Sequence, residues 1–138
     1  MIALTRRYAF PAAHVLRSPA LSDDENARVY GKCANPGGHG HDYGLEVSVS
    51  GPVDARSGLI VDRAALDAIV EERVLDRFGY RMLNEDPAFG ARVPTAENIA
   101  AQIHAILAGP IAELGSVRLF RVRLHETRKN SFAYGESR

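Results

Sequence analysis

Three histidines in this sequence could together hold a metal ion. His39 and His41 lie two residues apart in an alternating segment, so their imidazoles project from the same face of an extended strand. His14, which ends the segment FPAAH, could supply a third nitrogen. Three protein nitrogens with an open position are typical of a catalytic zinc site, whereas structural sites usually close with four ligands and favour cysteine. The alternative is that these are unrelated core or surface histidines, because a His-x-His pair alone is a weak signal.

The single cysteine, Cys33, lies six residues before His39 in a turn-rich loop. One cysteine excludes an internal disulfide and leaves either an inert buried thiol or a reactive one. A structural cysteine usually belongs to an apolar core segment, so the loop position favours chemistry. Neighbouring Lys32 and a zinc ion would both lower the pKa of the thiol, and the thiolate could then act as a general base.

A carboxylate shares the apolar side of the alternating segment 117–126. Glu126 has the same parity as Val122 and Leu124, while His125 points the other way. Burial of an ionised carboxylate without partners is costly, so a ligand with adjacent N–H donors would suit Glu126. Alternatively, the strand ends before Glu126 and the carboxylate is solvated.

The periodicity of the sequence predicts the elements that must position these residues. Period-two alternation predicts strands over residues 2–10, 39–50, 117–126 and 131–134. Helical periods predict one helix that follows an N-cap at Asp62 and a second that follows Thr95 and stops near Gly109. Residues 18–38 are expected to form a polar loop. This order predicts an α+β fold, in which a four-stranded antiparallel sheet carries two helices on one face.

Composition excludes several classes of partner. The 138 residues suit a single domain spanning 1–138, and 17 lysines and arginines balance 17 aspartates and glutamates. No net field would therefore hold the chain on nucleic acid or a membrane surface. The N-terminal segment lacks the apolar core of a signal peptide, and no stretch approaches the roughly 18 apolar residues of a membrane span. We therefore expect a soluble, cytoplasmic protein.

The chain resembles, nearly from end to end, the 6-pyruvoyl tetrahydropterin synthase family, which includes the 6-carboxy-5,6,7,8-tetrahydropterin synthases. The most specific segment is YGKCANPGGHGHDY, in which five residues separate the cysteine from His-Gly-His. That gap is similar to the gap in the animal synthases. The other segments that carry the resemblance are FPAAH, LSDDEN, GPVDARSGLIVD, MLNED, PTAEN and LHET.

The resemblance implies a tunnelling fold (T-fold), in which the sheets of several subunits join into a barrel as a trimer or hexamer, with sites between subunits. It implies a zinc-dependent lyase that acts on 7,8-dihydroneopterin triphosphate and forms 6-pyruvoyl- or 6-carboxy-tetrahydropterin, so the expected partner is a small pterin. The implied roles are zinc binding for His14, His39 and His41, proton transfer for Cys33, and pterin binding for Glu126 and Thr95. Candidates for the phosphates are Lys32, Arg6, Arg7 and Lys129.

The sequence departs from the family at one motif. The family's Asp-His relay falls on Gly79 and Tyr80 in a gapless match, and a register shifted by three residues still offers no histidine. Tyr80 could donate protons through its phenol, and His125 is another candidate for the missing group. The departure leaves two alternatives open: an aldolase-like relative that cleaves the side chain of dihydroneopterin, and a pterin-binding protein without turnover.

Overall fold

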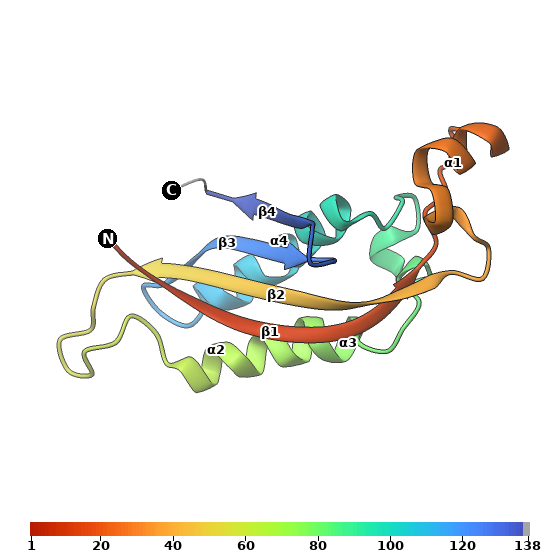
Figure 1. The fold of residues 1–138 in the computed structure, drawn as a ribbon. Coiled ribbons are helices and arrows are strands. Elements are labelled where there is room, and N and C mark those ends of the chain that lie inside the picture. The colour runs from red at the N-terminus through yellow and green to blue at the C-terminus, as the bar shows by residue number, and fades with distance from the viewer. Residues whose placement is uncertain (137–138) are drawn as a thin grey trace.

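The computed structural model describes residues 1–136, in which four strands form one antiparallel sheet (Figure 1). The strands lie in the order β1 (Ile2–His14), β2 (His39–Gly51), β3 (Arg118–His125) and β4 (Ser131–Gly135). The predicted antiparallel sheet is thus confirmed. β1 extends four residues beyond the predicted end, because Pro11 lies in an edge strand, where a missing N–H is tolerated.

Two helical segments cover one face of the sheet (Figure 1). α2 (Arg63–Val70) begins at Asp62, whose carboxylate accepts two backbone N–H groups, and it continues through a π-helical turn into α3 (Asp76–Phe78). α4 (Ala96–Ala112) begins at Thr95, whose hydroxyl accepts the Asn98 N–H. α4 ends at Ala112, two residues beyond Pro110, and so continues slightly past its predicted end near Gly109 and Pro110.

A further helix, α1 (Asp23–Tyr30), lies in the segment that was expected to be a polar loop. It is capped reciprocally: the Ser22 hydroxyl accepts the Glu25 N–H, and the Glu25 carboxylate accepts the Ser22 N–H. α1 stands away from the sheet at one end of the molecule (Figure 1). Among the residues of α1 only Asn26 is buried, so no apolar period could reveal this helix, although the capping-box motif could have done so.

The apolar core lies between the sheet and the helices that cover it. Its largest fully buried members include Tyr43, Leu45 and Val47 from β2, Leu66 and Phe78 from the α2–α3 segment, and Ile99, Ile103 and Leu107 from α4. Each such side chain contributes roughly 1.5–3 kcal/mol of burial free energy. In register, β1 and β2 place His14 opposite His39 at the end of the sheet that lies nearest to α1. The longest described helix has 17 residues, and the described helices include none suited to crossing a membrane.

Candidate metal centre

Three imidazoles converge where β1 ends and β2 begins. His14 and His39 are cross-strand partners, and His41 follows on the same face of β2. One ring nitrogen from each histidine lies within 4.8 Å of the others, and the Nε2 atoms of His39 and His41 are 2.9 Å apart. His14 is fully buried and the other two are half-buried. The structure thus brings together the three residues that the sequence singled out.

The backbone of a distant segment fixes the protonation of His14. Its Nδ1 lies 2.9 Å from the carbonyl oxygen of Pro94, which can only accept, so Nδ1 must carry the hydrogen. The Tyr43 hydroxyl lies 3.3 Å from the same nitrogen. Burial lowers the pKa of His14 from 6.5 to about 4, so the ring is neutral at pH 7. Nε2 of His14 therefore offers its lone pair to the cluster.

The donor set fits a bound metal ion. The Nε2 atom of His14 is buried, and no described residue of the chain supplies it with a hydrogen-bond partner. Buried polar atoms are rarely left in this state, and a cation at the cluster would satisfy it. Burial also lowers the pKa of His41, which keeps a second ring neutral. Neutral imidazoles suit transition metals such as zinc, copper and iron.

Glu126 lies beside the histidines, immediately after β3. Its Oε2 is 4.0 Å from Nε2 of His14 and 3.9 Å from Nε2 of His41, and its side chain is only 15% exposed. Burial, with a smaller effect from the charge of Glu97, raises the pKa of this carboxyl. Thr95 is close in the chain to this group, because it directly follows the Pro94 carbonyl that binds His14.

Cys33 lies at the edge of the cluster, beside His39. Its Sγ lies 3.5 Å from Nε2 of His39, and its carbonyl oxygen accepts the Leu16 N–H at 2.7 Å. The expectation that Lys32 lowers the pKa of the thiol was wrong for the chain alone. Burial raises the pKa of Cys33, and the negative charge of Glu126 raises it further. Lys32 is exposed to solvent, where its charge is screened.

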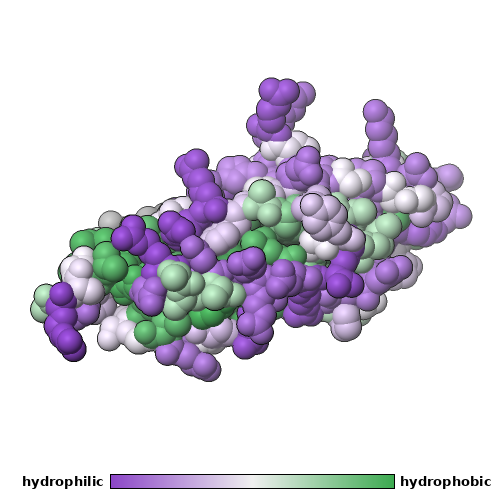
Figure 2. Space-filling view, turned by 90° about the horizontal axis from the view of Figure 1, so that it is seen from below, coloured by the Kyte–Doolittle hydropathy of each residue, from purple (hydrophilic) through white to green (hydrophobic). Residues whose placement is uncertain are grey.

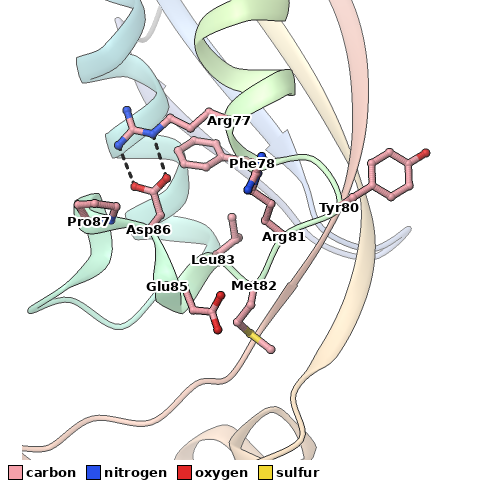
Figure 3. A pocket seen from close by; sticks show the side chains of 9 residues that line it. All are labelled: Arg77, Phe78, Tyr80, Arg81, Met82, Leu83, Glu85, Asp86 and Pro87. Carbon is pink, nitrogen blue, oxygen red and sulfur yellow. Dashed lines mark hydrogen bonds and ion pairs between the residues drawn. The ribbon is translucent and has the colours of Figure 1, made fainter.

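The two other candidates for proton transfer lie outside this cluster. The Tyr80 side chain is 91% exposed. Figure 3 shows a pocket that Tyr80 lines together with Phe78 and Leu83, and the Tyr80 ring points away from these two side chains. Tyr80 also lines a second pocket, with His41. His125 forms a 2.6 Å contact with the carboxylate of Glu46. Its cross-strand partner is Gly44, so it lies on the face of the sheet opposite Tyr43.

The backbone at Gly79 excludes a side chain. A Cβ at this position would lie 2.6 Å from the carbonyl oxygen of Leu75, a distance that a fixed helix end cannot accept. The next residue, Tyr80, has a φ of 60°, and its N–H donates to the Pro11 carbonyl at 2.6 Å. The departure from the relay motif is therefore accompanied by a local backbone that leaves no room for an aspartate.

The candidate phosphate ligands are dispersed. Arg6 donates two hydrogen bonds to Asp67 of α2, which also accepts the Tyr8 hydroxyl, so Arg6 is committed elsewhere. The pKa of Glu46 is lowered first by its bond to His125 and in smaller part by Arg7, which lies opposite it on β1. Lys129, like Lys32, is exposed.

Sequence reasoning missed one cation near the site. Arg81 lines the pocket of about 380 Å³ that also contains His41 and Tyr80. Its carbonyl oxygen accepts the Ala13 N–H at 2.9 Å, which ties it to the strand that carries His14. In the sequence, the position of Arg81 directly after Tyr80 is the one indication that it lies near the site.

Comparisons with known proteins agree over the whole chain. The family model for 6-pyruvoyl tetrahydropterin synthase matches residues 3–137. The 6-pyruvoyl tetrahydrobiopterin synthase of Drosophila melanogaster is 39% identical over 95% of this chain and 77% of its own length. A putative 6-carboxy-5,6,7,8-tetrahydropterin synthase of Archaeoglobus fulgidus is 38% identical over 64% of this chain and 69% of its own.

A solved structure shares the fold closely. The 6-pyruvoyl tetrahydropterin synthase of Caenorhabditis elegans superposes with a TM-score of 0.86 at 37% identity, and the match covers 99% of this chain and 96% of that one. The fold and the sequence match over residues 3–137 lead to the same conclusion. This chain belongs to the 6-pyruvoyl tetrahydropterin synthase family.

Proposed function

We propose that this protein is a zinc-dependent lyase that converts 7,8-dihydroneopterin triphosphate to 6-pyruvoyl-tetrahydropterin. The observation that carries the proposal is the convergence of three imidazoles with a thiol and a half-buried carboxylate at one end of the sheet. The match to the pyruvoyl synthase of Drosophila melanogaster over 95% of the chain favours the pyruvoyl product over the carboxy product, whose relative matches 64%.

The metal would be held by His14, His39 and His41. A zinc ion in such a site polarises hydroxyl groups of a bound molecule and makes neighbouring protons easier to remove. His14 is prepared for this role, because its bond to the Pro94 carbonyl leaves Nε2 as the only basic ring nitrogen. Glu126 is too far from the ring nitrogens for a hydrogen bond and remains available to a substrate.

Cys33 is assigned as the general base. Its Sγ lies at the edge of the histidine cluster and can accept a proton from the substrate side chain. The raised pKa of the thiol in the chain alone means that it is largely protonated at neutral pH. Its activation therefore depends on positive charge brought by the loaded site.

Glu126 and Thr95 are assigned to the pterin ring. A carboxylate that is 15% exposed and lies beside the histidine cluster can accept two adjacent N–H groups of a ring with charge-assisted hydrogen bonds. The Thr95 oxygen already accepts the Asn98 N–H, but its own hydrogen is free to donate. Together the two side chains offer an acceptor pair and a donor to one edge of the ring.

Gly79 and Tyr80 favour a second candidate function. Because Gly79 leaves no room for an aspartate, the relay that general acid–base catalysis would use is missing from this segment. Loss of such a group typically costs about a hundredfold to ten-thousandfold in rate. A protein that cleaves the side chain of dihydroneopterin like an aldolase, or that binds pterins without turnover, remains the alternative. Tyr80 and His125 stay the candidates for the relay's place, but in the single chain both lie outside the histidine cluster, so neither supplies the missing group there.

Assembly into a trimer or hexamer is part of the proposal. β1 and β4 are the edge strands of the sheet in the described chain. The segment around Met82 bridges β1 at Ala13, while the outer edge of β1 before Pro11 has no neighbouring strand among the described residues and can offer N–H and C=O groups to another sheet. Apolar side chains also gather near the left end of the face in Figure 2. Ile2, Val53 and Leu59 are among the large apolar side chains that the single chain leaves exposed. Both features support a barrel formed by several copies.

Incubation of the purified protein with 7,8-dihydroneopterin triphosphate, followed by mass separation of the products, tests the function. Release of triphosphate with formation of 6-pyruvoyl-tetrahydropterin is the expected result. Loss of a two-carbon fragment would indicate the carboxy branch. Cleavage of dihydroneopterin itself, or tight binding of a pterin without any product, would replace the proposal with the corresponding alternative.

A further inference from the structure

Asn26 is fully buried although its helix, α1, stands away from the sheet. Its Oδ1 accepts the Ser18 N–H at 2.8 Å. Its Nδ2 lies 3.0 to 3.2 Å from the carbonyl oxygens of Ser18, Leu21 and Ser22. One amide thus ties α1 to the chain that leads into it from β1.

The same part of the chain carries Cys33. α1 runs directly into a 3-10 turn, Gly31–Ala34, that contains the cysteine. The bond from the Leu16 N–H to the Cys33 carbonyl oxygen closes residues 16–34 into a compact unit, which we call the cysteine lobe. Because Val29 is 56% exposed and Asn26 is the one buried residue of α1, the polar contacts of Asn26 rather than apolar packing hold this helix in the lobe.

The three histidines depend on a different support. His14 lies in β1, and His39 and His41 lie in β2, which pairs with β1 over 13 register positions. Loosening the cysteine lobe should therefore move the thiol without releasing the metal ligands. The two halves of the site are supported separately.

We propose that Asn26 is a positioning residue that holds the cysteine lobe closed and thereby places Cys33 Sγ beside His39. This inference rests on the proposed function only because that function assigns proton transfer to the Cys33 thiol. Removal of the Asn26 amide would leave its buried backbone partners without hydrogen bonds, so the lobe should open more often. Asn26 acts on the reaction through the position of Cys33 and touches neither substrate nor metal.

The rate at which iodoacetamide alkylates Cys33, measured on the purified protein and on its Asn26→Ala variant, tests this inference. Cys33 is the only cysteine, so every adduct seen by mass reports on this thiol. We expect alkylation to accelerate about tenfold, the population change that follows from one lost buried hydrogen-bonding group. The Leu16 amide should exchange faster with solvent. Metal content should stay at the wild-type value, and kcat should fall with little change in KM.

The matched control is Asp62→Ala, which removes the N-cap of α2 at the opposite end of the sheet. It lowers global stability but should leave alkylation unchanged. Equal acceleration in both variants, or wild-type alkylation and Leu16 protection in Asn26→Ala, would overturn the inference. If Asn26→Ala does not fold, Asn26→Asp keeps the volume and should loosen the lobe, because a carboxylate oxygen then faces backbone carbonyls. Faster alkylation in a protein that lacks turnover would support the positioning role and defeat the proposed function.

Discussion

His14 Nδ1 donates to the carbonyl oxygen of Pro94, a residue 80 positions further along the chain, over 2.9 Å. The bond joins the end of β1 to the segment that starts α4, and it decides which nitrogen of His14 is free. The metal-ligating state of the ring is therefore a property of the packed fold and not of the local sequence. Docking of α4 onto the sheet and formation of the metal centre are coupled.

Replacement of Cys33 by alanine should abolish turnover and leave the metal content unchanged. The thiol lies 3.5 Å from a ring nitrogen of His39, but the three imidazoles already supply the ligand set. Elemental analysis and product assays on the same preparation provide the measurement. Loss of metal from Cys33→Ala would make the thiol a ligand and remove its assignment as a base.

Replacement of Glu126 by glutamine should weaken pterin binding by about tenfold to a hundredfold, because a charge-assisted acceptor becomes a neutral amide. Titration with a dihydropterin, followed by fluorescence, gives the dissociation constant. Glu113→Gln, at the exposed far end of α4, is the control and should bind normally. Unchanged affinity in Glu126→Gln would exclude this carboxylate from the pterin site.

Gly79→Ala should destabilise the fold by about 1–3 kcal/mol, because its Cβ would approach the Leu75 carbonyl oxygen to 2.6 Å. Gly109→Ala is the matched control. A Cβ at Gly109 meets nothing within 4 Å in α4, so this variant should gain roughly 0.5–1 kcal/mol from helix propensity. Urea unfolding measures both values. A neutral Gly79→Ala would mean that the segment can move enough to accept an aspartate.

Asp86→Asn should reduce the loss of folding stability that the protein shows as the pH falls. Hydrogen bonds from Arg77 lower the pKa of Asp86 below its usual 3.8 (Figure 3). The unfolded chain therefore binds more protons near that pH, and the stabilisation is complete above pH 3.8 and is lost as the pH falls through the folded-state pKa. At pH 7 the free energy of unfolding of the wild type should exceed that of the variant by roughly 1 kcal/mol. The difference is small because Arg77 is partly exposed. A difference that persisted unchanged to pH 2 would contradict this.

Periodicity predicted most of the sheet and both covering helices, because these elements bury one face and the burial pattern follows their geometry. β2 agrees with its predicted bounds within a residue, Asp62 is the predicted N-cap of α2, and α4 begins directly after Thr95, as predicted. α1 escaped prediction because its only buried residue is the polar Asn26. A helix held by an amide rather than by an apolar stripe leaves no hydrophobic period.

The histidine cluster was predictable where strand geometry determines it. The spacing of His39 and His41 fixes their common face, but only the register between β1 and β2 brings His14 opposite His39. The roles of Pro94 and Tyr43 could not be predicted, because a carbonyl or a buried hydroxyl gains meaning only from tertiary contacts. The raised pKa of Cys33 was missed for the same reason, since the burial of the thiol and the nearby charge of Glu126 both arise from tertiary packing.

Metal content measured by elemental analysis on protein purified without chelators tests the account most directly. We expect one zinc per chain in the wild type and a substoichiometric amount in His14→Ala, His39→Ala and His41→Ala. His104→Ala should retain the full amount, because this histidine of α4 packs against Tyr134 of β4 and takes no part in the cluster. A wild-type protein without stoichiometric metal, or triad variants that keep it, would contradict the account.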